Sequence, residues 1–188
     1  MTNLTKRSGA ARLMAAALCA TVLTFGASRA EESPQPSADA RAMTAYEVVV
    51  LYSGKSWQWP DGAGRLESDG RRFTAISGSG ETTNWAEGRW LVTDGGSLCL
   101  EANWHASGES YPDRTCFDHR VDGNTIYQRR SPAGDWFVFK HAQAKPDDEF
   151  SRLVPNDLVS VRLEDARSTT SATQPSSGPS ISGVNDNE

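Results

Sequence analysis

The sequence predicts a mainly β protein, an antiparallel meander that forms a small closed or curled barrel with one short N-terminal helix. Asp-Gly dipeptides, which favour tight hairpin turns, recur four times between positions 61 and 123. Runs rich in aromatic and β-branched residues flank these turns, and all six Trp residues lie between positions 44 and 141. Many short strands at such close spacing are typical of a barrel and not of an α/β fold.

The first thirty residues have the pattern of a secretory signal peptide, predicted over 1–30. A basic start precedes an apolar run over 13–27 that is too short and too alanine-rich to span a bilayer, and Ser-Arg-Ala at 28–30 suits signal peptidase. Residues 31–43 are rich in Glu, Ser and Pro and are predicted to be a disordered linker. We therefore expect a periplasmic or secreted protein that has no transmembrane segment after signal removal.

Cleavage of this signal would make the chain more acidic. It would remove four of the nineteen basic residues and none of the twenty-four acidic ones, which leaves a formal net charge of −9 in place of −5. Such a surface is repelled by phosphate backbones and by anionic membrane surfaces, and no basic stripe with interleaved aromatic residues is present in the sequence. No nucleic-acid partner is expected.

A short helix is predicted over residues 45–53. Thr44 and Glu47 have the spacing of a capping box, and Gly54 suits the end of a helix. The three valines at 48–50 favour a strand instead. The helix is preferred because its apolar residues share one face: Val48, Leu51 and Tyr52.

Eight strands follow within a β-barrel-like domain predicted over residues 44–142. They are bounded by the turn dipeptides and by changes in the hydrophobic pattern. The predicted strands are 56–60, 64–68, 71–76, 85–93, 97–105, 111–120, 124–130 and 135–141.

The chain after this domain is predicted to be mostly irregular. Residues 143–166 form a charged connector in which Val159, Val161 and Leu163 alternate with polar residues, a pattern that indicates a possible edge strand. Residues 167–188 are rich in Ser, Thr, Pro and Gly and lack aromatic residues, so a disordered tail is expected.

Cys99 and Cys116 are the two cysteines that remain after signal removal, and an exported protein is expected to join them. The bridge closes a loop of about 17 residues and would stabilise the fold by about 3 kcal/mol. If the two sulfurs face each other across antiparallel strands, Glu101 faces Arg114 on the same side. On the other side Leu98 faces Phe117 and Trp104 faces Tyr111, and the connection is a four-residue hairpin loop at 106–109.

This register defines an apolar face that carries the candidate ligand-binding residues. Trp104, Tyr111 and His119 lie on it, while Trp57 and Trp59 share one face of an earlier strand. An aromatic-lined cleft suits sugars, lipids and other planar ligands. Two interpretations of His119 stay open, a buried histidine with satisfied hydrogen bonds and a residue at the mouth of a ligand cavity.

No catalytic residue, metal or cofactor is predicted. The chain lacks a Gly-x-Ser-x-Gly elbow, a Gly-rich phosphate loop and a His-Glu-x-x-His helix. A zinc site drawn from the two cysteines, His105 and His119 is disfavoured, because exported thiols pair with each other and Cys116 and His119 lie on opposite faces of a strand. Carboxylate pairs for glycoside hydrolysis could be chosen from Glu67, Glu81, Glu87 and Glu101, but the spacing along the chain does not give their separation.

An ordered set of motifs lies between residues 44 and 142. It consists of Gly54-Lys55-x-Trp57, Asp61-Gly62-x-Gly64, Gly88-x-Trp90, Cys99, Trp104-His105, Cys116, His119 and Trp136-x-x-Phe139. This set resembles the family of small exported bacterial proteins known as domain of unknown function 995. The resemblance implies export and a shared fold, and it implies no activity.

These features favour a non-enzymatic periplasmic binding or envelope-associated module. Its partner would be a small apolar or glycan ligand in the barrel, or an envelope protein on the rim. Two alternatives stay open, an enzyme that acts on envelope polysaccharide and a small inhibitor of an envelope hydrolase that presents the loop at 106–109.

Overall fold

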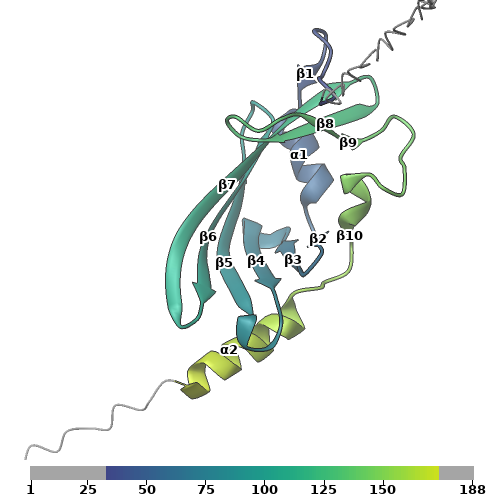
Figure 1. Cartoon of the computed structure of the whole chain (residues 1–188). Helices are drawn as coiled ribbons and strands as arrows, with labels where there is room; N and C mark the ends of the chain where they lie inside the picture. The colour runs from purple at the N-terminus through teal and green to yellow at the C-terminus, as the bar shows by residue number, and fades with distance from the viewer. Residues whose placement is uncertain (1–32, 174–188) are drawn as a thin grey trace, which may run out of the picture. The chain divides into compact units, whose positions relative to one another are not determined.

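The computed structural model describes residues 33–173 (Figure 1). The predicted signal peptide and residues 174–188 of the predicted tail lie outside the described residues. No helix between residues 33 and 173 is long and apolar enough to cross a membrane.

One antiparallel sheet forms most of the described chain, in the order β10-β2-β3-β4-β5-β6-β7-β8-β9. A further short strand, β1 (Arg41–Ala42), pairs with β7 beside this path. Strands β2 to β9 correspond in order to the eight predicted ones, with ends that differ by a few residues. Their bounds are β2 (Lys55–Trp59), β3 (Gly62–Leu66), β4 (Arg72–Ser77), β5 (Asn84–Val92), β6 (Ser97–Ala106), β7 (Glu109–Asp122), β8 (Thr125–Arg130), β9 (Phe137–Lys140) and β10 (Leu153–Val154).

The sheet is a curled half-barrel and not a closed barrel, since no ladder joins its end strands β9 and β10 in the described part of the chain. The long strands β5, β6 and β7 bend along their length (Figure 1). Gly88 permits a close approach of β5 to β6, because a Cβ atom at this position would lie 1.9 Å from the carbonyl oxygen of Glu101. Glycine inside a strand commonly marks a bend or a close approach of a neighbouring backbone.

Helix α1 (Ala45–Tyr52) packs against β5 and β6 on the concave side of the sheet. The Thr44 hydroxyl accepts a hydrogen bond from the backbone N–H of Glu47, and the Glu47 carboxylate accepts one from the backbone N–H of Thr44. Both bonds of a capping box therefore start the helix. The buried face consists of Val48, Leu51 and Tyr52, which join a core with Leu66, Phe73, Trp90, Leu98 and Phe139.

Helix α2 (Ser160–Thr173) overturns the prediction of an edge strand near Val159. Val159 lies directly before the helix, and the backbone N–H of Leu163 donates to its carbonyl oxygen at 2.9 Å, so the two residues lie on the same side. Both are buried against Ala63, Ile76 and Trp85 on the convex face, whereas Val161 is 75% exposed. The prediction of a disordered tail from residue 167 is also wrong at its start, because residues 167–173 belong to α2.

The residues on either side of the predicted β domain are also part of the fold. Ala40 and Met43 are buried, so the disordered linker predicted over 31–43 ends before them. The charged connector contains the 3₁₀ helix η3 (Glu149–Arg152) and strand β10, which pairs with β2. These segments are polar in composition, and their few apolar side chains become ordered by packing on the sheet.

Cys99 and Cys116 form a disulfide between directly facing positions of β6 and β7, as predicted. The predicted register is confirmed, and Arg114 forms an ion pair with Glu101 at 3.1 Å. The prediction of a four-residue hairpin loop is wrong, because Ala106 and Glu109 are still paired. Only Ser107 and Gly108 form the loop, with positive φ angles of 51° and 82° that suit a two-residue hairpin turn of type I′.

Candidate ligand-binding pocket

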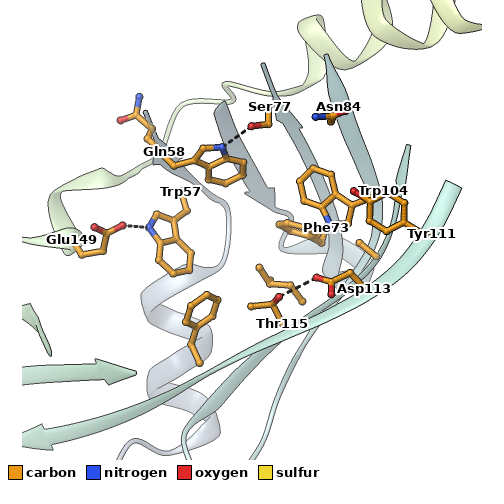
Figure 2. Close-up of a pocket in the computed structure, with 14 residues that line it drawn as sticks. Trp57, Gln58, Phe73, Ser77, Asn84, Trp104, Tyr111, Asp113, Thr115 and Glu149 are labelled. Atoms are coloured by element: carbon orange, nitrogen blue, oxygen red, sulfur yellow. Dashed lines mark hydrogen bonds between the residues drawn. The ribbon is translucent and has the colours of Figure 1, made fainter. Parts of the chain in front are cut away.

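A pocket of about 520 Å³ lies on the concave side of the sheet (Figure 2). This volume is in the range of sites for small molecules. Strands β2 and β4 to β7 and helix η3 supply its walls. The lining residues are Trp57, Gln58, Trp59, Phe73, Ser77, Asn84, Leu100, Ala102, Trp104, Tyr111, Asp113, Thr115, Phe117 and Glu149.

The register of the strands explains why the pocket exists. One row of facing positions crosses six strands, and facing residues in a sheet project to the same side. Aromatic residues occupy the two ends of the row, and the residues between them have no side chain or only a methyl group. The row is Trp57, Gly64, Ala75, Ala86, Trp104 and Tyr111.

Gly64 leaves space at the base of the pocket for two aromatic rings. A Cβ atom at this position would lie 2.8 Å from Phe73 Cε2 and 3.3 Å from Trp59 Cζ3. Because Gly64 has no side chain, both rings can lie close to β3 at this position.

Two pocket tryptophans are held by hydrogen bonds of their indole N–H groups. Trp57 Nε1 donates to Glu149 Oε1 at 2.7 Å, and Glu149 Oε2 forms an ion pair with Arg152 at 3.3 Å. Trp59 Nε1 donates to Ser77 Oγ at 3.3 Å, and Ser77 Oγ donates to Asp61 Oδ2 at 2.8 Å. The indole N–H groups are thus satisfied and the rings are oriented before any ligand binds.

Polar side chains interrupt the aromatic lining at a few positions. Asp113 Oδ2 accepts a hydrogen bond from Thr115 Oγ1 at 3.0 Å. Figure 2 shows Asp113 of β7 and Glu149 of η3 on opposite sides of the pocket. Among the described residues, none of those that line the pocket is Lys, Arg or His. This arrangement can stack a flat apolar surface and can form hydrogen bonds at its edges.

The structure brings four of the five predicted ligand-binding residues to this pocket: Trp57, Trp59, Trp104 and Tyr111. His119 is not among the lining residues and is 1% exposed. It lies near Tyr52 and Phe139, and the Tyr52 ring is 5.6 Å from that of Trp57. His119 therefore lies in the core behind the pocket wall.

The hydrogen bonds of His119 match the first of the two interpretations, a satisfied buried histidine. Its Nδ1 lies 3.0 Å from the carbonyl oxygen of Gly96, which can only accept, so Nδ1 carries the proton. Nε2 then accepts from the Tyr52 hydroxyl at 2.8 Å, and Gln128 Nε2 donates to the same hydroxyl at 2.7 Å. Burial lowers the pKa of His119 from 6.5 to about 4, so the ring is neutral near pH 7.

The carboxylates that the sequence offered for glycoside hydrolysis do not line this pocket. Glu87 and Glu101 border a separate hollow of about 450 Å³ and form ion pairs with Arg167 and Arg114. Among residues 33–173 no group of three or more His, Cys, Asp and Glu side chains is placed to hold a metal ion.

Sequence reasoning did not select Phe73, Asp113, Phe117 or Glu149 as pocket residues. The predicted β6–β7 register already places Asp113 and Phe117 on the same face as Tyr111, since they are two and six residues away from it. Glu149 lies within the charged connector, and no local pattern marks it as a pocket residue, because it reaches the pocket only through the packing of η3.

Fold and pocket define a class of protein, a small curled half-barrel with a helix on its concave side and an aromatic pocket next to that helix. The chain belongs to the family described as Protein of unknown function (DUF995), whose model matches residues 15–159. The matched segment includes every residue that lines the pocket. No curated protein and no solved structure matches the chain.

Proposed function

We propose that the protein is a non-enzymatic binding module of the cell envelope, periplasmic or secreted, that holds a small ligand in the pocket of its curled sheet. The observation that carries this proposal is the joining of Trp57, Trp59, Trp104 and Tyr111 around one hollow. Such an aromatic lining is a common way to hold the apolar face of a sugar ring or another flat ligand.

The polar residues of the pocket support a ligand with hydroxyl or amide groups. Ser77, Asn84 and Thr115 lie among the aromatic residues and carry uncharged polar groups. Gln58 alternates with Trp57 and Trp59 in β2, and its side chain points away from the pocket (Figure 2). A glycan fits this mixture better than a pure hydrocarbon does, because a hydrocarbon would give the Asn84 amide no hydrogen-bond partner. We therefore favour an envelope glycan over an apolar lipid.

Two features support a location outside the cytoplasm. The first thirty residues have the composition of a signal peptide. Cys99 and Cys116 form a disulfide, which is typical of exported proteins.

A hydrolase that acts on envelope polysaccharide is the second candidate, since Asp113 and Glu149 lie on opposite sides of the pocket (Figure 2). Glycosidases use two carboxyl groups, one of which must donate a proton. Glu149 accepts a hydrogen bond from Trp57 and pairs with Arg152, whereas Asp113 is exposed to solvent. Neither environment is the apolar one that suits a proton donor, so binding without turnover is favoured.

The proposal is tested by titrating the purified protein with soluble envelope glycans while its Trp fluorescence is measured. We expect a saturable change that Trp104→Ala weakens about fivefold or more, because stacking on one ring contributes on the order of 1 kcal/mol or more. Trp136→Ala is the matched control, since Trp136 packs against Arg120 and Arg129 outside the pocket.

The same samples are then assayed for released reducing ends. Binding without product supports the binding module. Product formation that Asp113→Asn or Glu149→Gln abolishes would establish the hydrolase instead, and a lack of binding by every glycan would count against both.

A further inference from the structure

We propose that the pocket selects its ligand by charge and that the preferred ligand carries an amine or another organic cation on a flat body, for example an amino sugar with a free amine. This inference rests on the proposed binding function and names the class of ligand for the same pocket.

The formal charges of the pocket lining are all negative. Asp113 and Glu149 carry them, and residues 33–173 contribute no Lys, Arg or His side chain to the lining. An anionic ligand would meet two like charges, one of them at the solvent-exposed Asp113. A cationic ligand would meet opposite charges in the same place.

Asp113 is the carboxylate without a countercharge. Within residues 33–173 it forms no ion pair, and Thr115 donates a neutral hydrogen bond to it. The neighbouring Arg114 projects to the opposite face of β7, where it pairs with Glu101. Glu149 differs because Arg152 already compensates part of its charge. Asp113 is therefore the residue that we expect to contact the cation.

The basic residue of β2 on the pocket face is directed elsewhere. Lys55 lies two positions before Trp57 in β2 and so projects to the same side of the sheet. Its Nζ donates to the carbonyl oxygens of Leu51 at 2.6 Å and Val50 at 3.3 Å, at the end of α1. The ammonium group thus caps the helix and adds no positive charge to the pocket lining.

The aromatic residues strengthen the same preference. The faces of Trp and Tyr rings carry partial negative charge and attract cations, in particular where water is excluded. Trp104 and Tyr111 face each other across β6 and β7 in the row next to Asp113. A cation near Asp113 can therefore also contact a ring.

The test compares oligosaccharides of equal length and different charge by isothermal titration calorimetry at pH 6, where sugar amines are largely protonated. The probes are the trimers of glucosamine, N-acetylglucosamine and galacturonate, which are cationic, neutral and anionic. Benzyltrimethylammonium, benzyl alcohol and benzoate form a second series without a sugar and distinguish a sugar amine from any other organic cation. Each titration is performed at low and at high salt.

We expect the glucosamine trimer to bind about tenfold or more tightly than the N-acetylglucosamine trimer, with the galacturonate trimer weakest. Asp113→Asn should reduce the cation preference to about threefold or less, and high salt should do the same. Glu164→Gln is the matched control, because it removes one negative charge from the exposed side of α2 and should leave the preference unchanged.

Equal binding of the charged and neutral trimers, or tightest binding of the anion, would overturn the charge inference and leave the binding function standing. An undiminished cation preference in Asp113→Asn would show that this carboxylate is not the contact. If none of the six probes bound to the folded protein, both the inference and the binding function would be contradicted.

Discussion

The buried cluster of Tyr52, His119 and Gln128 shows how single residues secure the core behind the pocket. His119 and Gln128 project from neighbouring strands, and Tyr52 reaches them from α1. Because Trp57 packs against the Tyr52 ring, this cluster also supports one wall of the pocket. The sequence indicated that His119 is the odd polar residue of an apolar face, but its partners come from 67 positions earlier and 9 positions later in the chain.

The neutral state of His119 predicts a pH dependence of stability. The unfolded chain takes up a proton on this ring near pH 6.5, whereas the folded protein does so only near pH 4. The free energy of unfolding should therefore be highest above pH 6.5 and should fall by about 3 kcal/mol as the pH is lowered toward 4. Glu47 does not obscure this window, because its pKa of about 2, set by Arg41 and Thr44, places its loss of stability below pH 4.5.

Urea denaturation at pH 7.0, 6.0 and 4.8 measures this dependence in the unmodified protein and in His119→Asn. The variant should be less stable at pH 7 and should show a flatter slope between these values. If the variant does not fold, an NMR titration of the His119 ring in the unmodified protein replaces it. A ring that titrates near pH 6.5 in the folded protein would refute the account.

At the scale of elements, local sequence patterns predicted the strands and failed for the segments that depend on packing. The Asp-Gly turns and the alternating runs carry information about a strand and its neighbour, so the β6–β7 register followed from the two cysteines. The alternation of Val159, Val161 and Leu163 also fits a helix, because positions 159 and 163 are four residues apart. The convex face of β3, β4 and β5 decides between these possibilities, and that face exists only in the folded protein.

Helix α2 provides a prediction at this scale. Leu163→Ala should lower the free energy of unfolding by about 2 to 4 kcal/mol, because Leu163 is 4% exposed and fills the space above Ala63 and Ile76. Val161→Ala, in the same helix but 75% exposed, should change it by about 0.5 kcal/mol or less. Equal effects of the two substitutions in urea denaturation would show that α2 does not cover the sheet in solution.

At the scale of the whole molecule, the pocket results from rows of residues that span several strands. The sequence predicted one pair of such a row, Trp104 and Tyr111, from the disulfide register. It did not predict that Trp57 completes the row across β3, β4 and β5, because a one-residue shift in any of the intervening hairpins would place Trp57 on the other face. The aromatic residues of the pocket could be selected from the sequence, but the hollow between them depends on the register of every pair of neighbouring strands from β2 to β7.

The central claim is that this hollow binds a ligand, and the six indole N–H signals in a ¹H–¹⁵N NMR spectrum test it most directly. Each signal is assigned by replacing one Trp with Phe, and the glucosamine trimer is then added in steps. If the pocket binds the trimer, the signals of Trp57, Trp59 and Trp104 shift and saturate together, while those of Trp85 on the convex face and Trp136 stay in place. Shifts confined to Trp85 or Trp136, or no shift of any indole signal with the sugars and the aromatic cation, would contradict this claim.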